Sequence, residues 1–251
     1  MHMNYSKSYA ADLLRGVDVT QRPPLTQNLA RELAGKNKKL LDVGCGTGKK
    51  SFSLADDYQT IIGLEPSGEL LEIAQSEINN HKLKNCYVVD GVSEMLPFQN
   101  NAFDVVMCVL SWWHASEIHR VLNSAGVFLL ECLGPKDKAD FTRFFGKDDK
   151  GWRGANLNTD FAEMEKNIKN KLANYFQHVT LENITWQTRY SKAGLWALLN
   201  NTFSTVRDFH PVNDQAAFDE AIKQLQTDEG VVLTQNRLLV VAKRANEVII
   251  Y

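Results

Sequence analysis

The apolar residues in the first half of the chain fall into short, nearly continuous runs. These runs lie at 39–44, 60–65, 85–90, 102–110 and 126–133 and are rich in Val, Leu and Ile. Runs of this length predict strands that are buried on both faces, as in a parallel sheet covered by helices. Right-handed crossovers make such a sheet doubly wound, and its ligands bind at the carboxyl ends of the strands.

The segments around these runs have the spacing of helices. The segment 67–80 carries one apolar stripe, which predicts an amphipathic helix, and shorter helices are expected at 49–57 and 116–124. The N-terminal part predicts a helix at 8–16, a loop broken by prolines and a second helix at 26–35. Strands that alternate with helices in this way indicate an α/β fold.

After Gly134 the alternation is lost, and the apolar pattern becomes mainly helical. Thr159 is a plausible cap for the first of these helices, and the segment 178–190 alternates like a strand. The helices are expected at 159–176, 191–201 and 216–228.

The last apolar segments predict two strands, 230–234 and 237–244. Two polar residues, Gln235 and Asn236, separate them. We therefore expect an antiparallel hairpin that turns at these two residues.

Composition sets limits on the partners. The chain has 251 residues, a formal net charge of -2 and a pI near 6.3, so it carries no strong field for nucleic acid or an anionic membrane. No apolar run is long enough for a membrane helix, and the N-terminal residues lack the pattern of a secretory signal. We expect a cytoplasmic protein without nucleic-acid or membrane partners.

The four cysteines, Cys45, Cys86, Cys108 and Cys132, form no CxxC pair, and three of them sit in strand-like runs. Reduced, buried thiols are the simplest interpretation. The six histidines are scattered as well, so no metal site is expected.

The strongest local signal is the glycine-rich stretch "LLDVGCGTGKKS" at residues 40–51. A phosphate-binding P-loop would need its first glycine where Val43 stands, and a hydroxyl residue where Lys50 stands, so this interpretation is rejected. A dinucleotide fingerprint would accept Gly44 and Gly46 but places Lys49 at its third glycine. A nicotinamide oxidoreductase therefore stays open only as an alternative.

The string Asp42 to Gly48, "DVGCGTG", resembles the first motif of class I S-adenosylmethionine-dependent methyltransferases. Three further stretches resemble later motifs of the family in the right order: "GLEPSGELLEIAQ", "GVSEMLPFQNNAFDVVMCVLSWWH" and "EIHRVLNSAGVFLLE". The resemblance covers roughly residues 38–132 and is strongest to the branch that methylates quinones and other small molecules, with a domain of the methyltransferase 11 type.

The resemblance implies a Rossmann-like α/β fold: a doubly wound, seven-stranded, mostly parallel sheet with helices on both faces and a helical lid. It implies one domain over 1–251. Its expected parts are an N-terminal helical cap (1–37), a cofactor-binding core (38–134), a lid or substrate region (135–230) and C-terminal strands (231–251).

The resemblance also implies S-adenosylmethionine as cofactor, with S-adenosylhomocysteine as product. The three glycines would let the backbone approach the methionine part, Asp42 would lie near its cationic end, and Glu65 would accept hydrogen bonds from the ribose hydroxyls. The expected cofactor-binding residues are Asp42, Gly44, Cys45, Gly46, Gly48, Glu65, Pro66, Val92, Ser93 and Cys108.

The adenine segment departs from the family pattern. Val92 stands where the family often has an acid, so its side chain cannot accept a hydrogen bond from the adenine amino group. Adenine selection would then fall to backbone groups and to Ser93.

The acceptor site of this fold opens after the fourth strand, at Ser111, Trp112, Trp113 and His114. His114 is the candidate general base, and a solvent-exposed histidine at a helix entry is an equal alternative. Two adjacent tryptophans cannot face the same side of a strand, so one is expected to pack and the other to line the site. Tyr9 is a further candidate lining residue.

Tyr5 and Arg22 match the family's N-terminal cap by rough position only. The aromatic residues of the lid suggest an apolar or aromatic small-molecule acceptor, although amphipathic helices also need such residues to pack. The predicted function is methyl transfer by direct displacement to a small molecule. The alternatives are a protein that binds the cofactor without turnover, the nicotinamide oxidoreductase, and an RNA methyltransferase, which would need a basic face that the composition does not indicate. The sequence leaves the oligomeric state open.

Overall fold

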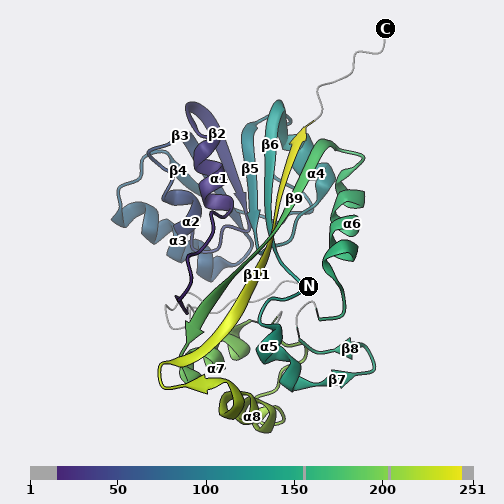
Figure 1. Cartoon of the computed structure of the whole chain (residues 1–251). Helices are drawn as coiled ribbons and strands as arrows, with labels where there is room; N and C mark the ends of the chain where they lie inside the picture. Colours follow the sequence, from purple (N-terminus) through teal and green to yellow (C-terminus); the bar gives the residue numbers. More distant parts are fainter. Residues whose placement is uncertain (1–15, 155–156, 203–204, 245–251) are drawn as a thin grey trace.

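The computed structural model describes residues 16–154, 157–202 and 205–244. The helix expected at 8–16, together with Tyr5 and Tyr9, therefore lies almost entirely outside the described residues. The centre of the molecule is a nine-stranded sheet in the order β1-β9-β11-β6-β5-β2-β3-β4, with β10 beside β11 (Figure 1).

The parallel half of the sheet confirms the five strands expected from the apolar runs. They are β2 (Gly35–Val43), β3 (Tyr58–Glu65), β4 (Cys86–Asp90), β5 (Phe103–Val109) and β6 (Leu122–Leu133). All neighbouring pairs among them are parallel. Since β2 lies between β3 and β5, the strand order reverses beside β2. A ligand is therefore expected at the carboxyl end of β2.

Helices cover both faces of this sheet, as predicted. On one face lie α1 (Thr26–Glu32), α2 (Lys49–Phe52) and α3 (Gly68–Asn80), whose apolar residues share a core with one side of the parallel strands. On the other face lie α4 (Ala115–Val121) and α6 (Phe161–Leu172). The helix expected at 49–57 is correct in position but shorter, because turns follow Phe52.

The hairpin expected near the C-terminus is wrong. Residues 230–244 form one continuous strand, β11 (Gly230–Arg244), which pairs with β9 (Phe176–Tyr190) along almost its full length. Asn236 is completely buried, and its side-chain amide donates to Asn183 Oδ1 at 2.6 Å and to Ile184 O at 2.9 Å. The polar pair is therefore satisfied inside the sheet and does not need a turn.

The sheet has nine strands where seven were expected. The difference comes from two strands of two residues each, β1 (Val17–Asp18) and β10 (Gln226–Thr227), which pair with β9 and β11. The other seven strands are the long ones, so the predicted architecture is confirmed apart from these short additions.

The region expected as a helical lid contains more than helices. Four short helices, α5 (Ala139–Thr142), η3 (Arg143–Phe145), α7 (Lys192–Asn201) and α8 (Gln215–Leu225), enclose a second apolar core, which we call the helical body. The strands β7 (Lys147–Asp148) and β8 (Gly151–Trp152) form a small separate hairpin beside it. Strand β9 also falls in this region, and β9 and β11 run from the main sheet into the helical body (Figure 1).

Within the described ranges, no helix has the length and apolar character needed to cross a membrane.

Candidate functional site

The glycine-rich loop joins β2 to α2 and is fixed to the end of β3. The backbone amides of Gly44 and Cys45 both donate to Leu64 O, at 2.8 and 3.0 Å, and Gly48 N donates to Cys45 O at 3.0 Å. Gly44, Gly46 and Gly48 all have positive φ, at 73°, 58° and 73°. Other residues rarely adopt this conformation, so the loop requires glycine at these three positions.

Two of the three glycines are also required by close contacts. A Cβ on Gly44 would lie 1.9 Å from Ser111 Oγ, and a Cβ on Gly48 would lie 2.1 Å from the Phe52 ring. A Cβ on Gly46 would have no described neighbour within 4 Å. Gly46 thus marks the open side of the loop, where a ligand can approach the backbone.

Glu65 ends β3 and ties the loop to α3. It is only 4% exposed, and its Oε2 accepts from Gly46 N at 2.9 Å while its Oε1 accepts from Ser67 N at 3.0 Å. Burial raises the pKa of Glu65, and these two amide bonds oppose the rise. Each carboxylate oxygen can accept a second hydrogen bond, so Glu65 keeps acceptor capacity for a ligand. Pro66 is exposed between Glu65 and the helix.

Asp42 is the second buried acid beside the loop. It is 3% exposed, and burial is the main reason why its pKa rises from 3.8 to about 6. A hydrogen bond with Ser51 and the charge of Lys50 counteract the rise, while Glu65 adds to it. Asp42 therefore takes up a proton more readily than an ordinary aspartate.

The two cysteines predicted in the cofactor site have different surroundings. Cys45 is half-buried, and its Sγ lies 2.6 Å from where a Cβ on Gly63 would stand. Cys108 has no exposed surface, and its thiol donates to Trp112 O at 3.6 Å. Burial raises the pKa of both thiols. Cys108 thus lies behind the site rather than in it, because β5 is covered on both faces here.

The predicted adenine segment and the predicted base meet in the structure. Ser93 Oγ lies 3.3 Å from His114 Nδ1, which brings the loop after β4 against the start of α4. Val92 forms a bridge with Met95 in the same loop. The His114 side chain is exposed.

The two adjacent tryptophans differ, as expected. Trp113 packs on Phe128 with ring centroids 5.8 Å apart, whereas Trp112 is 69% exposed at the carboxyl end of β5. Ser111 lies against Gly44 and so borders the glycine-rich loop.

A group of buried charges close to this edge was not predicted. Glu131 on β6 and Arg237 on β11 approach to 3.6 Å, Arg237 also pairs with Asp137, and Lys138 pairs with Asp137 at 2.8 Å. The only signal in the sequence is charge inside otherwise apolar strands, in "FLLECL" and "NRLLVV". Charged residues are almost never fully buried unless they are paired.

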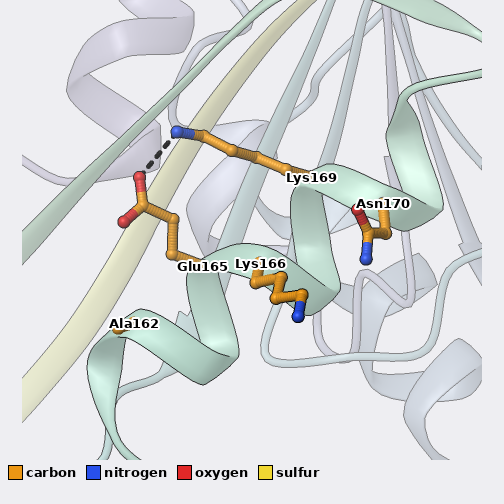
Figure 2. A pocket seen from close by; sticks show the side chains of 5 residues that line it. All are labelled: Ala162, Glu165, Lys166, Lys169 and Asn170. Carbon is orange, nitrogen blue, oxygen red and sulfur yellow. Dashed lines mark hydrogen bonds and ion pairs between the residues drawn. The ribbon is translucent and has the colours of Figure 1, made fainter.

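Figure 2 shows a hollow elsewhere, on α6, with a volume of about 330 Å³ and one ion pair, Glu165 to Lys169 at 2.7 Å, at its rim. Its lining comes from this single helix: Ala162, Glu165, Lys166, Lys169 and Asn170. Because α6 and α2 cover opposite faces of the sheet, this hollow is not part of the site at the glycine-rich loop.

Comparison with known proteins agrees with this geometry. Residues 41–130 match the family model of a methyltransferase domain. This stretch of the chain is therefore similar to methyltransferase domains. The match spans the glycine-rich loop, Glu65 and the end of β5, and it favours a methyltransferase over a nicotinamide oxidoreductase.

Relatives with curated names are similar over a stretch of comparable length. The uncharacterized methyltransferase YcgJ of Bacillus subtilis is 31% identical over 107 residues, which are 39% of this chain and 42% of YcgJ. A demethylmenaquinone methyltransferase of Geobacillus stearothermophilus is 31% identical over 107 residues, 37% of this chain and 44% of the relative. The chain thus matches less than half the length of these relatives.

The similarity of the fold extends further than the similarity of the sequence. The crystal structure of YcgJ from Bacillus subtilis aligns with a TM-score of 0.62 and 18% identity over 88% of this chain and 98% of that chain. This similarity confirms the methyltransferase fold.

Proposed function

We propose that the protein binds S-adenosylmethionine at the glycine-rich loop and transfers its methyl group to a small molecule. The arrangement of Glu65 carries this proposal, since its carboxylate holds the open glycine of the loop and still has free lone pairs at the end of β3. This cofactor has a ribose, a cationic sulfur and a zwitterionic methionine part. The loop and the two acids beside it, Asp42 and Glu65, offer a hydrogen-bonding partner or a charge of the right sign to each part.

The chain's residues would hold the cofactor as follows. Glu65 accepts from the ribose hydroxyls, and the backbone at Gly46 lies against the methionine part. Asp42 supplies negative charge near the ammonium and the sulfonium. Val92 and Ser93 lie beside the adenine. The Val92 side chain is apolar and cannot form a hydrogen bond with it. Pro66 and Cys45 also line the cofactor site. Cys108 is buried and packs behind the residues that line it.

The acceptor lies on the open side of the site near Ser111 and Trp112. Methyl transfer by direct displacement needs the acceptor atom in line with the sulfur and close to it, and it needs no covalent enzyme intermediate. His114 accepts the acceptor's proton where one must leave, and Ser93 orients its ring. The demethylmenaquinone methyltransferase among the relatives supports a small-molecule acceptor.

We also propose that the protein works in the cytoplasm without nucleic acid as a partner. Four free cysteines fit a reducing compartment, and the net charge of -2 gives no general attraction for nucleic acid.

Calorimetric titration with S-adenosylhomocysteine tests the proposed function. Glu65→Gln removes the charge but keeps the shape, and we expect it to weaken binding about 10- to 100-fold, the size of a lost charged hydrogen bond. Glu69→Gln, an exposed position in the first turn of α3, is the matched control and should bind like the wild type.

Two results would contradict the assignment. One is a wild-type protein that ignores S-adenosylhomocysteine and binds NAD(P)H. The other is a Glu65→Gln variant that keeps its far-ultraviolet circular dichroism and binds with unchanged affinity. Binding without methyl transfer to a broad acceptor panel would instead identify a cofactor-binding protein without turnover.

A further inference from the structure

Glu131 is a buried acid at the carboxyl edge of the sheet that the proposed function does not use. It lies near the end of β6 and is 3% exposed. A charged side chain is almost never buried to this extent unless it is paired, and its burial is costly when its hydrogen-bonding capacity is left unfilled. The partners of Glu131 therefore distinguish a structural role from a binding role.

Strand pairing places Glu131 beside the proposed acceptor site. It pairs with Val109 on β5, and its carbonyl oxygen accepts from Leu110 N at 2.8 Å. Ser111, the next residue along the chain, lies against Gly44 of the glycine-rich loop. Glu131 is thus a neighbour of the segment at which the acceptor is proposed to lie.

The Glu131 side chain lies on the same face of the sheet as Asp42. Asp42 pairs with Met107 on β5, which pairs with Leu129 on β6. Met107 and Leu129 both pack in the core that α1, α2 and α3 share with the sheet. Side chains two residues apart along a strand share a face. Glu131 therefore belongs to this face, one row nearer the carboxyl edge than Asp42.

Arg237 compensates the charge of Glu131 but does not donate a hydrogen bond to it. The ion pair joins Arg237 Nε and Glu131 Oε1 at 3.6 Å, which is too long for a hydrogen bond. Nη1 of Arg237 donates instead to Asp137 and, at 2.9 Å, to Asn236 O. Within the part of the chain that the structure describes, no side chain or backbone amide donates to the Glu131 carboxylate.

A second acid in the same row has different surroundings. Leu239 on β11 pairs with Glu131 on one side and with Glu182 of β9 on the other, so the two acids share a row and a face. Glu182 is exposed, and water can satisfy its carboxylate. Glu131 is shielded from water, and Leu25 packs on Leu239 beside it. The unfilled capacity is therefore particular to Glu131.

The charges around Glu131 favour a neutral hydrogen-bond donor. Glu131 and Asp137 are the two acids of this buried group. Arg237 and Lys138 are its two bases, so the charges balance. A further cation would be repelled by Arg237, and an anion would be repelled by Glu131. A hydroxyl group donates a hydrogen bond without adding charge, so it fits the carboxylate.

We propose that the Glu131 carboxylate accepts a hydrogen bond from a hydroxyl group of the methyl acceptor and makes the site selective for hydroxylated molecules. The inference rests on the proposed function, which places the acceptor beside Ser111. Adjacent strands are about 4.8 Å apart, so Glu131 lies roughly 10 Å across the sheet from Gly44. The hydroxyl that it binds is therefore remote from the glycine-rich loop, and Glu131 determines specificity rather than acting as the base.

Calorimetric titration of the complex with S-adenosylhomocysteine tests this inference, with benzyl alcohol, toluene and benzylammonium as probes. The alcohol and the ammonium both donate hydrogen bonds but differ in charge, whereas toluene donates none. We expect the wild type to bind benzyl alcohol about 10-fold more tightly than toluene, the size of a hydrogen bond to a charged group. It should also bind the alcohol more tightly than the ammonium.

Variants of the two acids in the row supply the comparison. Glu131→Gln should lower the preference for benzyl alcohol over toluene about 5-fold, because the acceptor loses its charge. A purely structural role would change the binding of both probes together, so the ratio separates recognition from folding. Glu182→Gln removes the same charge from the exposed acid and should leave the ratio unchanged.

Glu131→Asp is a second variant that keeps the negative charge opposite Arg237. It withdraws the carboxylate by one methylene group, so it should also lower the preference for the alcohol. It supplies the comparison if Glu131→Gln does not fold, and binding of S-adenosylhomocysteine shows that either variant is folded.

Three results would overturn the inference. The wild type binds benzyl alcohol no more tightly than toluene, it prefers benzylammonium to the alcohol, or a folded Glu131 variant keeps the wild-type preference. If the wild type does not bind S-adenosylhomocysteine, the proposed function fails. The same probes titrated into the free protein then still decide whether Glu131 selects a hydroxyl group.

Discussion

At the scale of single residues, the site depends on two acids that are buried at strand ends. Asp42 and Glu65 are 3% and 4% exposed, and burial raises the pKa of each. Glu65 is satisfied by two backbone amides, whereas Asp42 has a side-chain bond with Ser51 and a distant cation, Lys50. A buried carboxylate of this kind lowers the stability of the folded protein, because its charged form is costly without a cationic ligand. Its presence therefore indicates a role in binding rather than in stability.

The pKa of about 6 for Asp42 predicts a pH dependence with a definite sign. Between pH 3.8 and about 6 the folded protein holds a proton that the unfolded chain releases, so Asp42 makes stability fall as pH rises through this window. In Asp42→Asn this loss is absent. We expect the variant to gain up to about 3 kcal/mol relative to the wild type between pH 4 and pH 8, measured by urea unfolding.

Ligand binding should show the opposite trend. The wild type should bind S-adenosylhomocysteine less tightly as pH falls through 6, because Asp42 loses the charge that faces the ammonium. Asp42→Asn should bind weakly without this pH dependence. The assignment to Asp42 is wrong if the wild type and Asp42→Asn show the same pH dependence of stability and of affinity. Glu65 is present in both proteins and would then be the source of that dependence.

At the scale of elements, a single polar contact decides where helix α6 begins. Helix α6 was expected to begin at Thr159, but its cap is Asp160, whose Oδ1 accepts from Glu163 N at 2.8 Å. Thr159 instead donates from its hydroxyl to the exposed Glu163 side chain. Neighbouring residues of similar cap preference cannot be ranked from sequence, because the backbone angle that aims the side chain is set by packing.

The cap of α6 can be tested with a pair of variants. Asp160→Ala should lower the free energy of unfolding by about 1 kcal/mol, since the amide of Glu163 loses its partner. Thr159→Ala should change it by less than about 0.5 kcal/mol, because an exposed side-chain pair contributes little. Urea unfolding followed by circular dichroism measures both, and equal losses would show that Thr159 shares the capping role.

At the scale of the whole molecule, two apolar cores are joined by the long strands β9 and β11. The buried charges beside the helical body form a group that we call the junction cluster: Glu131, Asp137, Lys138 and Arg237. Arg237 is its centre because it pairs with Glu131 and Asp137 from two other segments. Removing one partner of a buried charge group leaves the others uncompensated.

Arg237→Met should therefore destabilise the protein by about 3–5 kcal/mol, because the buried Glu131 loses its cation and the buried Asp137 keeps only Lys138. Arg189→Gln breaks an exposed ion pair with Glu229 and should cost no more than about 1 kcal/mol. Thermal and urea unfolding of both variants measure the difference. Similar losses in the two would mean that the junction cluster is not what holds the two cores together.

The sequence alone determined the parallel half of the fold and the glycine-rich loop. Its apolar runs and the positive-φ glycines are local features, since the period of a strand and the freedom of glycine act within a few residues. Only the tertiary structure decided that Gln235 and Asn236 continue a strand and that Trp112 is exposed while Trp113 is packed. It alone brought Glu131 and Arg237 to one face of the sheet. These outcomes depend on contacts between residues far apart in the chain, such as Asn236 with Asn183, which no local pattern encodes.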